Sequence, residues 1–188
     1  MINIDDEEFI RGDVPMTKQE IRILTIAKAG IKAGDVVIDI GAGTGSISIE
    51  AAHVARRVYA IEKNPNAVDL IEQNVEKFNL NNVIIINAEA PNGLEAIKKV
   101  DVVIIGGSGG NLKKIFETVD KILKPGGHIV VNCITIQTLT DCINYFKSNE
   151  NYKYEAIQVQ INRLQQIANY DMSKALNPIY IVNAIKNS

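Results

Sequence analysis

One stretch limits the possible folds of this chain more than any other. Residues 36–46 read VVIDIGAGTGS, a run of β-branched residues followed by three glycines at alternate positions. Helical spacing begins after the last glycine. The order of strand, glycine loop and helix is how an α/β domain holds a nucleotide-like ligand above the carboxyl end of its first strand. The nearly continuous apolar run also indicates a strand buried on both faces, in a parallel sheet with helices above and below.

Further strands and helices alternate around this stretch. We expect the next strands at residues 58–61, 83–86, 101–105 and 128–132, and helices at residues 18–29, 46–56, 64–78, 94–98, 111–123 and 135–148. Thr17 and Glu20 predict a capping box at the start of the first helix. Residues 154–163 and 178–185 resemble strands with no convincing helix between them, so they should run antiparallel. We therefore predict an α/β, Rossmann-like fold, with a seven-stranded, mostly parallel sheet, an antiparallel C-terminal strand pair and helices on both faces.

The composition is that of a globular protein. The chain has 188 residues, 46% of them hydrophobic and 22% charged, which suits a single domain over residues 1–188. A net charge of −2 supplies no overall positive field for nucleic acid or anionic lipid. The N-terminus is acidic and no apolar run could span a bilayer, so we expect a cytoplasmic protein without a membrane partner. We interpret Cys133 and Cys142 as buried thiols, and His53 and His128 as ordinary imidazoles, and expect no metal.

The residues around the glycine loop narrow the choice of ligand. Glu62 lies 21 residues after Gly41, at the end of the second expected strand, where a carboxylate can accept hydrogen bonds from both hydroxyls of a ribose. Ser46 stands where a dinucleotide fingerprint has its third glycine. A ribose-containing ligand other than a dinucleotide fits this pattern better.

At this point the sequence resembles the class I S-adenosylmethionine methyltransferases. The resemblance rests on Asp39 to Gly45 (DIGAGTG), the acid at Glu62, the segment Asn87 to Ala90, and Leu123 to Gly127 (LKPGG). Further motifs resemble the CbiT family, the decarboxylating cobalt-precorrin methyltransferases that act at carbon 15: GDVPMT at 12–17, EAP at 89–91, IGGSGG at 105–110 and NP at 177–178. That resemblance implies S-adenosylmethionine as cofactor, a cobalt-precorrin as substrate in cobalamin biosynthesis, and a homotetramer.

The resemblance also implies site residues. The expected cofactor contacts are Thr17, Gly41, Ala42, Gly43, Thr44, Gly45, Glu62 and Ala90, and the expected substrate contacts are Pro15, Met16, Gly106, Gly107, Ser108, Gly109 and Gly110. A glycine platform lets a broad ring approach and leaves backbone N–H groups for its carboxylates. Asp13 and Glu89 are candidate acids or orienting groups by position alone, with a loop or helix-cap carboxylate as the alternative, and no general base is named. Arg163 and Lys174 either pair with substrate carboxylates or are solvated at the surface.

Some alternatives stay open. Residues 12–17 are either a lid or simply the approach to the first helix; with that helix they form an expected N-terminal part over residues 1–30. The glycine loop is common to all class I methyltransferases, so the acceptor could also be RNA or protein, or the chain could bind the cofactor without chemistry. Low net charge and the absence of an Asp/Asn-Pro-Pro-Tyr/Phe tetrad after the fourth expected strand argue against amine methylation of nucleic acid.

Overall fold

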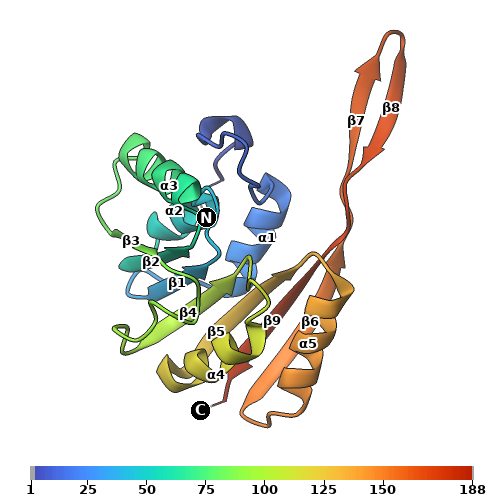
Figure 1. The fold of residues 1–188 in the computed structure, drawn as a ribbon. Coiled ribbons are helices and arrows are strands. Elements are labelled where there is room, and N and C mark those ends of the chain that lie inside the picture. Colours follow the sequence, from blue (N-terminus) through green and yellow to red (C-terminus); the bar gives the residue numbers. More distant parts are fainter. Residues whose placement is uncertain (1–2, 188) are drawn as a thin grey trace.

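The computed structural model describes residues 3–187 (Figure 1). Its helices are η1 (Asp6–Glu8), α1 (Gln19–Ala29), α2 (Ser46–Ala52), α3 (Pro65–Lys77), α4 (Leu112–Ile122) and α5 (Ile136–Lys147). Its strands are β1 (Val36–Ile40), β2 (Arg57–Glu62), β3 (Val83–Asn87), β4 (Val100–Ile105), β5 (Leu123–Cys133), β6 (Tyr152–Val159), β7 (Asn162–Ile167), β8 (Tyr170–Ala175) and β9 (Ile179–Lys186). Met1, Ile2 and Ser188, which the sequence prediction includes in the domain, lie outside the described residues.

Seven strands form one sheet in the order β3-β2-β1-β4-β5-β9-β6. The first five are parallel, and β9 runs antiparallel to both of its neighbours, β5 and β6. The predicted fold class is therefore confirmed, including the antiparallel pairing of the two C-terminal segments. Because β9 is inserted between β5 and β6, the last third of the chain widens the sheet beyond the parallel part.

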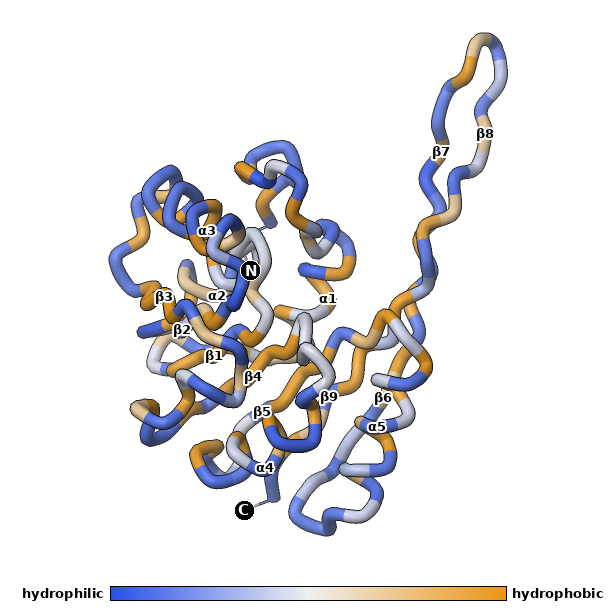
Figure 2. Tube along the Cα trace, viewed as in Figure 1, coloured by the Kyte–Doolittle hydropathy of each residue, from blue (hydrophilic) through white to orange (hydrophobic). Residues whose placement is uncertain are grey.

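Helices cover both faces of the sheet, and alternate residues of β1 show why. Val37 packs in a cluster with α1 and α2, while Ile38 and Ile40 point the other way into a cluster with α4 and α5. All five residues of β1 are buried. The β-branched run in the sequence thus reflects two separate cores, one on each face, and Figure 2 shows the hydrophobic residues concentrated along these central strands.

Several expected element boundaries are wrong. Residues 94–98 form turns instead of a helix, and α2 ends at Ala52, before the expected residue 56. Strand β5 already begins at Leu123 and includes the Pro-Gly-Gly segment expected to precede it, because a shift of register between Val100 and Val102 of β4 accommodates the extra residues.

The predicted capping box is also wrong. Helix α1 has Lys18 at its N-cap position, without a side-chain capping bond. The carboxylate of Glu20 instead accepts hydrogen bonds from Arg163, both at 2.8 Å. The Thr17 carbonyl accepts one from Arg22. A partner 143 residues away in the sequence therefore displaces the local cap.

Strands β7 and β8 form a two-stranded arm, which the sequence analysis missed (Figure 1). The arm projects away from the sheet, and all its strand residues are exposed. It occupies the segment expected to hold the end of one strand and a linker, since β6 already ends at Val159. A hairpin exposed on both faces carries no pattern of burial, so its sequence gave no periodic signal.

The first residues form a strap, residues 3–17, that buried Arg22 ties to α1 and α2. The Arg22 guanidinium donates to Asp6 Oδ1 at 3.1 Å, to Thr17 O at 2.9 Å and to Glu50 Oε1 at 3.0 Å, and also to Ile4 O. Its side chain is fully buried. The strap is therefore held in place by a charge inside the fold. No helix within residues 3–187 has the length and apolar character needed to cross a membrane.

Candidate active site

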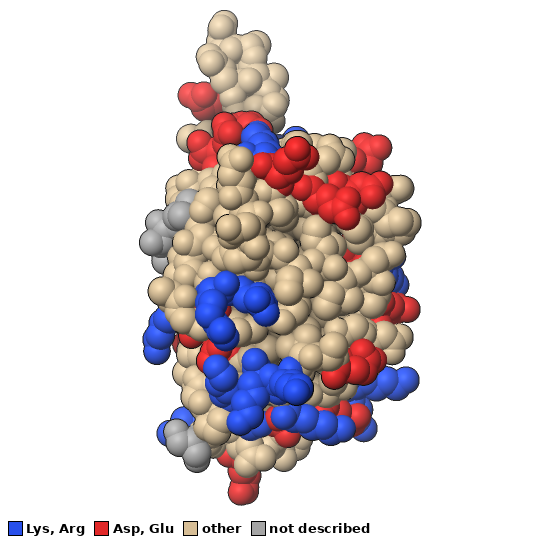
Figure 3. Space-filling model, turned by 90° about the vertical axis from the view of Figure 1, so that its left-hand side faces the viewer, with Lys and Arg blue, Asp and Glu red and all other residues tan. Residues whose placement is uncertain are grey.

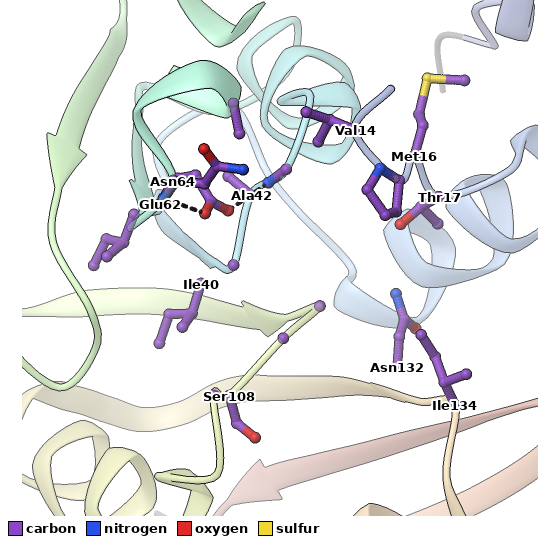
Figure 4. Close-up of a pocket in the computed structure, with 18 of the residues that line it drawn as sticks. Val14, Met16, Thr17, Ile40, Ala42, Glu62, Asn64, Ser108, Asn132 and Ile134 are labelled. Atoms are coloured by element: carbon purple, nitrogen blue, oxygen red, sulfur yellow. Dashed lines mark hydrogen bonds between the residues drawn. The ribbon is translucent and has the colours of Figure 1, made fainter. Parts of the chain in front are cut away.

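A cavity of about 600 Å³ opens at the carboxyl ends of the parallel strands (Figure 4). Ligands of open α/β sheets bind at this edge. Its walls come from the strap, the glycine loop after β1, the ends of β2 to β5, the first turns of α1 and α3, and the segment at the base of the arm. The cavity lies within the range of roughly 300–1,000 Å³ that small-molecule sites occupy.

The glycine loop is shaped by close backbone contacts. Gly41 has φ +69°, and a Cβ there would lie 2.6 Å from Gly107 O. Only glycine therefore allows the loop to pack against the backbone that follows β4. Gly43 has φ +57°, and a Cβ there would lie 3.1 Å from Pro15 O in the strap. Gly41, Ala42 and Gly43 line the cavity, whereas Thr44 is buried and, with Gly45, lies outside the lining.

Glu62 enters the cavity from the end of β2 and is held by two backbone N–H groups. Gly43 donates to Oε2 and Asn64 donates to Oε1, each at 2.9 Å (Figure 4). A carboxylate has about four acceptor sites, so two remain for a ligand. The prediction that Glu62 lies beside the glycine loop, where it could accept two ribose hydroxyls, therefore fits this geometry.

Asp39 precedes the glycine loop, near the end of β1. It is buried, and its Oδ2 accepts a hydrogen bond from Ser48 Oγ at 2.6 Å, while Oδ1 has no partner among the described residues. Burial, together with a smaller effect of the negative charge of Glu62, raises the pKa of Asp39 to about 6. Asp39 lies outside the cavity lining and connects β1 to α2 through Ser48, on the two sides of the glycine loop.

The two candidate acids lie in different places. Glu89 lines the cavity at its rim, where its Oε1 lies 2.8 Å from Lys63 Nζ. A Cβ on Gly109 would come within 2.8 Å of the same oxygen, so the loop after β4 closes against Glu89. Asp13 is exposed and lies outside the lining.

The expected substrate residues mostly face the cavity. Pro15 and Met16 of the strap line it together with Thr17, and Gly106 to Gly109 line it after β4, while Gly110 lies outside. Ala90 also lines it. The strap is therefore part of the cavity wall, which favours the lid interpretation of residues 12–17 over a simple approach to α1.

Arg163 and Lys174 do not reach the cavity. Arg163 is engaged with Glu20, and Lys174 lies opposite it in the register of the arm, exposed on β8. The interpretation as surface residues therefore holds in this structure.

One wall of the cavity was not predicted from the sequence as part of the site, although Asn177 belongs to the Asn-Pro motif named above. Its residues are Lys18, Ile21, Asn132, Ile134, Ile161, Leu176, Asn177 and Ile179. Asn132 and Ile134 could have been found, because β5 neighbours β4 and its carboxyl end must lie at the same edge. Ile161 and Leu176 lie side by side at the base of the arm, where Leu176 N donates to Ile161 O at 2.9 Å. No local sequence pattern predicts this contact.

Comparison with known proteins identifies the family. A family model described as a precorrin methyltransferase domain matches residues 8–186. The chain belongs to the precorrin methyltransferase family. This precorrin methyltransferase chain is 43% identical over 184 residues, 95% of each chain, to a probable cobalt-precorrin-6B C(15)-methyltransferase (decarboxylating) of Sulfurisphaera tokodaii. A relative of the same description from Methanobrevibacter smithii is 38% identical over 186 residues, 97% of this chain and 99% of the relative.

Solved structures place the fold in the same family. A precorrin-6y C5,15-methyltransferase from Geobacter metallireducens superposes with a TM-score of 0.92 at 39% identity and covers 98% of both chains. A precorrin 8w decarboxylase from Methanobacterium thermoautotrophicum gives 0.91 at 33% identity, over 96% of this chain and 98% of the other. A tRNA (m1A58) methyltransferase from Aquifex aeolicus, at 17% identity and a TM-score of 0.74, shares the fold alone. The resemblance found in the sequence is therefore confirmed at the level of the family.

Proposed function

We propose that this chain transfers a methyl group from S-adenosylmethionine to carbon 15 of a cobalt-precorrin of the 6B type, with decarboxylation of a ring acetate, in cobalamin biosynthesis. The observation that carries the proposal is the match along residues 8–186, because that span includes both the glycine loop and the wall at the base of the arm. We further propose that the reaction takes place in the cytoplasm and that residues 1–188 act as one class I methyltransferase domain.

One half of the cavity suits the cofactor. Glu62, fixed by Gly43 and Asn64, has acceptor sites left for two ribose hydroxyls. Gly41 to Gly43 present backbone without side chains, so a ligand can approach the loop closely. Bound S-adenosylmethionine supplies a methyl group on a sulfonium, an electrophile that is already activated. We propose that Thr44 and Gly45 assist by shaping the loop, while Thr17 and Ala90 contact the cofactor from the walls.

The other half suits a large flat acceptor. Ile21, Ile134 and Ile161 make it apolar, and Gly106 to Gly109 offer backbone N–H groups at its edge. Holding the ring against the methyl donor can lower the barrier by about 7–11 kcal/mol, so no strong base is required. Pro15 and Met16 of the strap exclude water from above.

Decarboxylation needs a proton at the carbon that loses carbon dioxide. The electron pair left by the broken C–C bond passes into the conjugated ring or is taken by that proton. Of the two candidate acids, we assign the role to Glu89, which lines the cavity. Its carboxylate is paired with Lys63, so it first takes up a proton from water at the rim and then delivers that proton to the carbon. Asp13, exposed outside the lining, is assigned no chemical step.

We also propose a homotetramer assembled through the arm. Leu164, Ile167, Tyr170 and Met172 are large apolar side chains that stand exposed on β7 and β8, with Leu164 77% and Tyr170 74% exposed. A cluster of such side chains on a projecting hairpin is typical of a surface that another chain covers.

A pigment assay tests the proposed function. The chain is incubated with labelled S-adenosylmethionine and cobalt-precorrin-6B, the metal-free pigment, or bulk RNA, and the products are weighed by mass spectrometry. We expect the cobalt pigment to gain one methyl group and lose one carbon dioxide. Methylation of RNA, or cofactor binding without transfer to any acceptor, would contradict the proposal.

Charge distribution argues against an extended RNA backbone along the outer surface near the cavity. Basic residues just before or at the start of the parallel strands lie at the amino edge of the sheet, the edge opposite to the cavity: Lys32, Arg56, Arg57, Lys98 and Lys99. In Figure 3 basic side chains gather at the end of the molecule away from the arm, and acidic ones gather near it. A long phosphate backbone would therefore find no continuous basic surface in the cavity lining, where the lysines, Lys18 and Lys63, lie 3.8 Å and 2.8 Å from a carboxylate.

A further inference from the structure

Asn132 presents an unpaired amide group to the cavity. It lies at the carboxyl end of β5, is 7% exposed, and lines the cavity. Its Oδ1 accepts a hydrogen bond from Thr25 Oγ1 of α1 at 3.0 Å. Its Nδ2 is buried and has no hydrogen-bond partner within residues 3–187. Figure 4 shows this side chain directed from β5 toward Thr17, across the cavity from the part where Glu62 lies.

Thr25 fixes which end of the amide faces inward. The Thr25 hydroxyl also donates to Ile21 O at 2.7 Å, so its single proton is shared between that carbonyl and Asn132 Oδ1. Because Oδ1 is the end of the amide that lies against Thr25, the NH₂ group is left to face the cavity. A buried donor without a partner is rare in a native protein and calls for a ligand or another explanation.

The position of Asn132 assigns it to the acceptor side. In the sheet order, β5 is two strands from β1, so Asn132 lies ~10 Å across the sheet from the glycine loop. Its neighbours in the lining, Ile21 and Ile134, are apolar. A fixed donor with apolar neighbours orients a ligand, because a polar group of that ligand must meet it.

The chemistry of the donor identifies the group that it meets. An amide NH₂ donates and does not accept, so its partner is an acceptor oxygen or nitrogen. In an apolar wall a carboxylate makes the stronger, charge-assisted bond. Lys18, which also lines the cavity, adds positive charge on the same side, partly shared with Asp6 at 3.8 Å.

We infer that the Asn132 amide donates a hydrogen bond to a carboxylate of the acceptor and so sets which edge of the ring faces the methyl donor. This inference rests on the proposed function, because the acceptor there is a polycarboxylated tetrapyrrole. Asn132 is in this account a specificity-determining residue, and Thr25 is the positioning residue behind it.

The Asn132→Asp variant tests the inference, with cobalt-precorrin-6B as acceptor. Aspartate keeps the shape of the side chain and an acceptor for Thr25, but it places a carboxylate oxygen where the NH₂ group was. We expect KM for the pigment to rise by about ten- to a hundredfold, the loss of a hydrogen bond to a charged group. The Kd of S-adenosylmethionine, measured by calorimetry, should stay within about twofold of wild type.

Asn183→Asp is the matched control. Asn183 is also 7% exposed and bonds through its Oδ1 to His128 Nδ1 at 3.2 Å, but it lies outside the cavity lining. This control should leave both KM and the cofactor Kd unchanged. A second measurement covers the case in which Asn132→Asp does not fold. With a pigment in which the contacted carboxylate is converted to an amide, the KM of the wild-type enzyme should rise by the same factor.

The outcomes separate the inference from the proposed function. An unchanged KM in Asn132→Asp, with wild type active on the pigment, would overturn the inference and leave the function standing. Equal loss of cofactor affinity would overturn it too, because the amide would then serve the cofactor. A wild-type enzyme without activity on the pigment would overturn the proposed function, and the inference with it.

Discussion

The two halves of the cavity are built in opposite ways. The cofactor half comes from one continuous stretch, Gly41 to Gly43, and from the strand next to it, which delivers Glu62. The acceptor half gathers the strap, the end of β5 and the base of the arm, and the strap lies more than a hundred residues before the other two in the sequence. The first half is fixed by short-range backbone bonds, whereas the second depends on the tertiary structure. Substitutions should therefore affect the two halves differently.

The largest effect is expected at Arg22, on which the strap depends. Arg22→Met leaves Glu50 and Asp6 without their buried partner, and breaking such a pair costs about 3–5 kcal/mol in the free energy of unfolding. Urea denaturation measures that cost. In the fraction that stays folded, KM for the acceptor should rise more than the cofactor Kd. Arg57→Met, at an exposed position in β2, is the control and should change neither.

A substitution at Asp39 tests whether a buried negative charge destabilises the cofactor half of the protein. Its folded pKa, raised to about 6 from 3.8, means that the folded state favours the protonated form. Stability from this group is therefore present below pH 3.8 and lost as the pH rises through 6, by about 3 kcal/mol in all. Asn in place of Asp39 should abolish that slope. Parallel pH curves of wild type and Asp39→Asn in urea denaturation would refute this account.

Gly43 tests the cofactor half by steric means. A valine at Gly43 would be forced into φ +57° with its Cβ 3.1 Å from Pro15 O, in the space that the cofactor needs. We expect at least a hundredfold loss of S-adenosylmethionine affinity, about 2.7 kcal/mol, in a protein that still folds. Calorimetry checks the affinity, and circular dichroism checks the fold. Wild-type affinity would show that the loop does not contact the cofactor.

Glu62 should show a smaller effect confined to the same half. Glu62→Ala removes hydrogen bonds to the ribose worth about 1.5–3 kcal/mol, so the Kd of S-adenosylmethionine should rise about ten- to a hundredfold. Glu62→Gln, which keeps one acceptor oxygen, should lose less. KM for the acceptor at saturating cofactor should not change. An unchanged cofactor Kd in Glu62→Ala would remove the ribose assignment.

The same contrast between the two halves explains which parts of the fold and of the site could be predicted from the sequence. The stretch from Val36 to Ser46 predicted β1, the loop and the start of α2, because each step depends on neighbouring residues. The distance from Gly41 to Glu62 predicted their meeting, because parallel neighbours end at one edge of the sheet. The arm could not be predicted, since an exposed hairpin has no buried face. The capping box failed because Glu20 pairs with Arg163, a contact that only the tertiary structure creates.

Breaking the ion pair between Arg163 and Glu20 should have the smallest effect on the free energy of unfolding, and it tests the acceptor half most directly. Arg163→Ala frees the arm from α1, and an ion pair with side chains 46% and 36% exposed is worth about 0.2–1 kcal/mol. Ile161, two residues before Arg163, lines the cavity, so loosening the base of the arm should raise KM for the acceptor by about two- to threefold. The cofactor Kd should not move. Lys174→Ala, opposite Arg163 in the arm, is the control and should leave KM unchanged. If Arg163→Ala raised the cofactor Kd as much as KM, the two halves would be coupled through α1, and the acceptor half could not be treated as a separate unit.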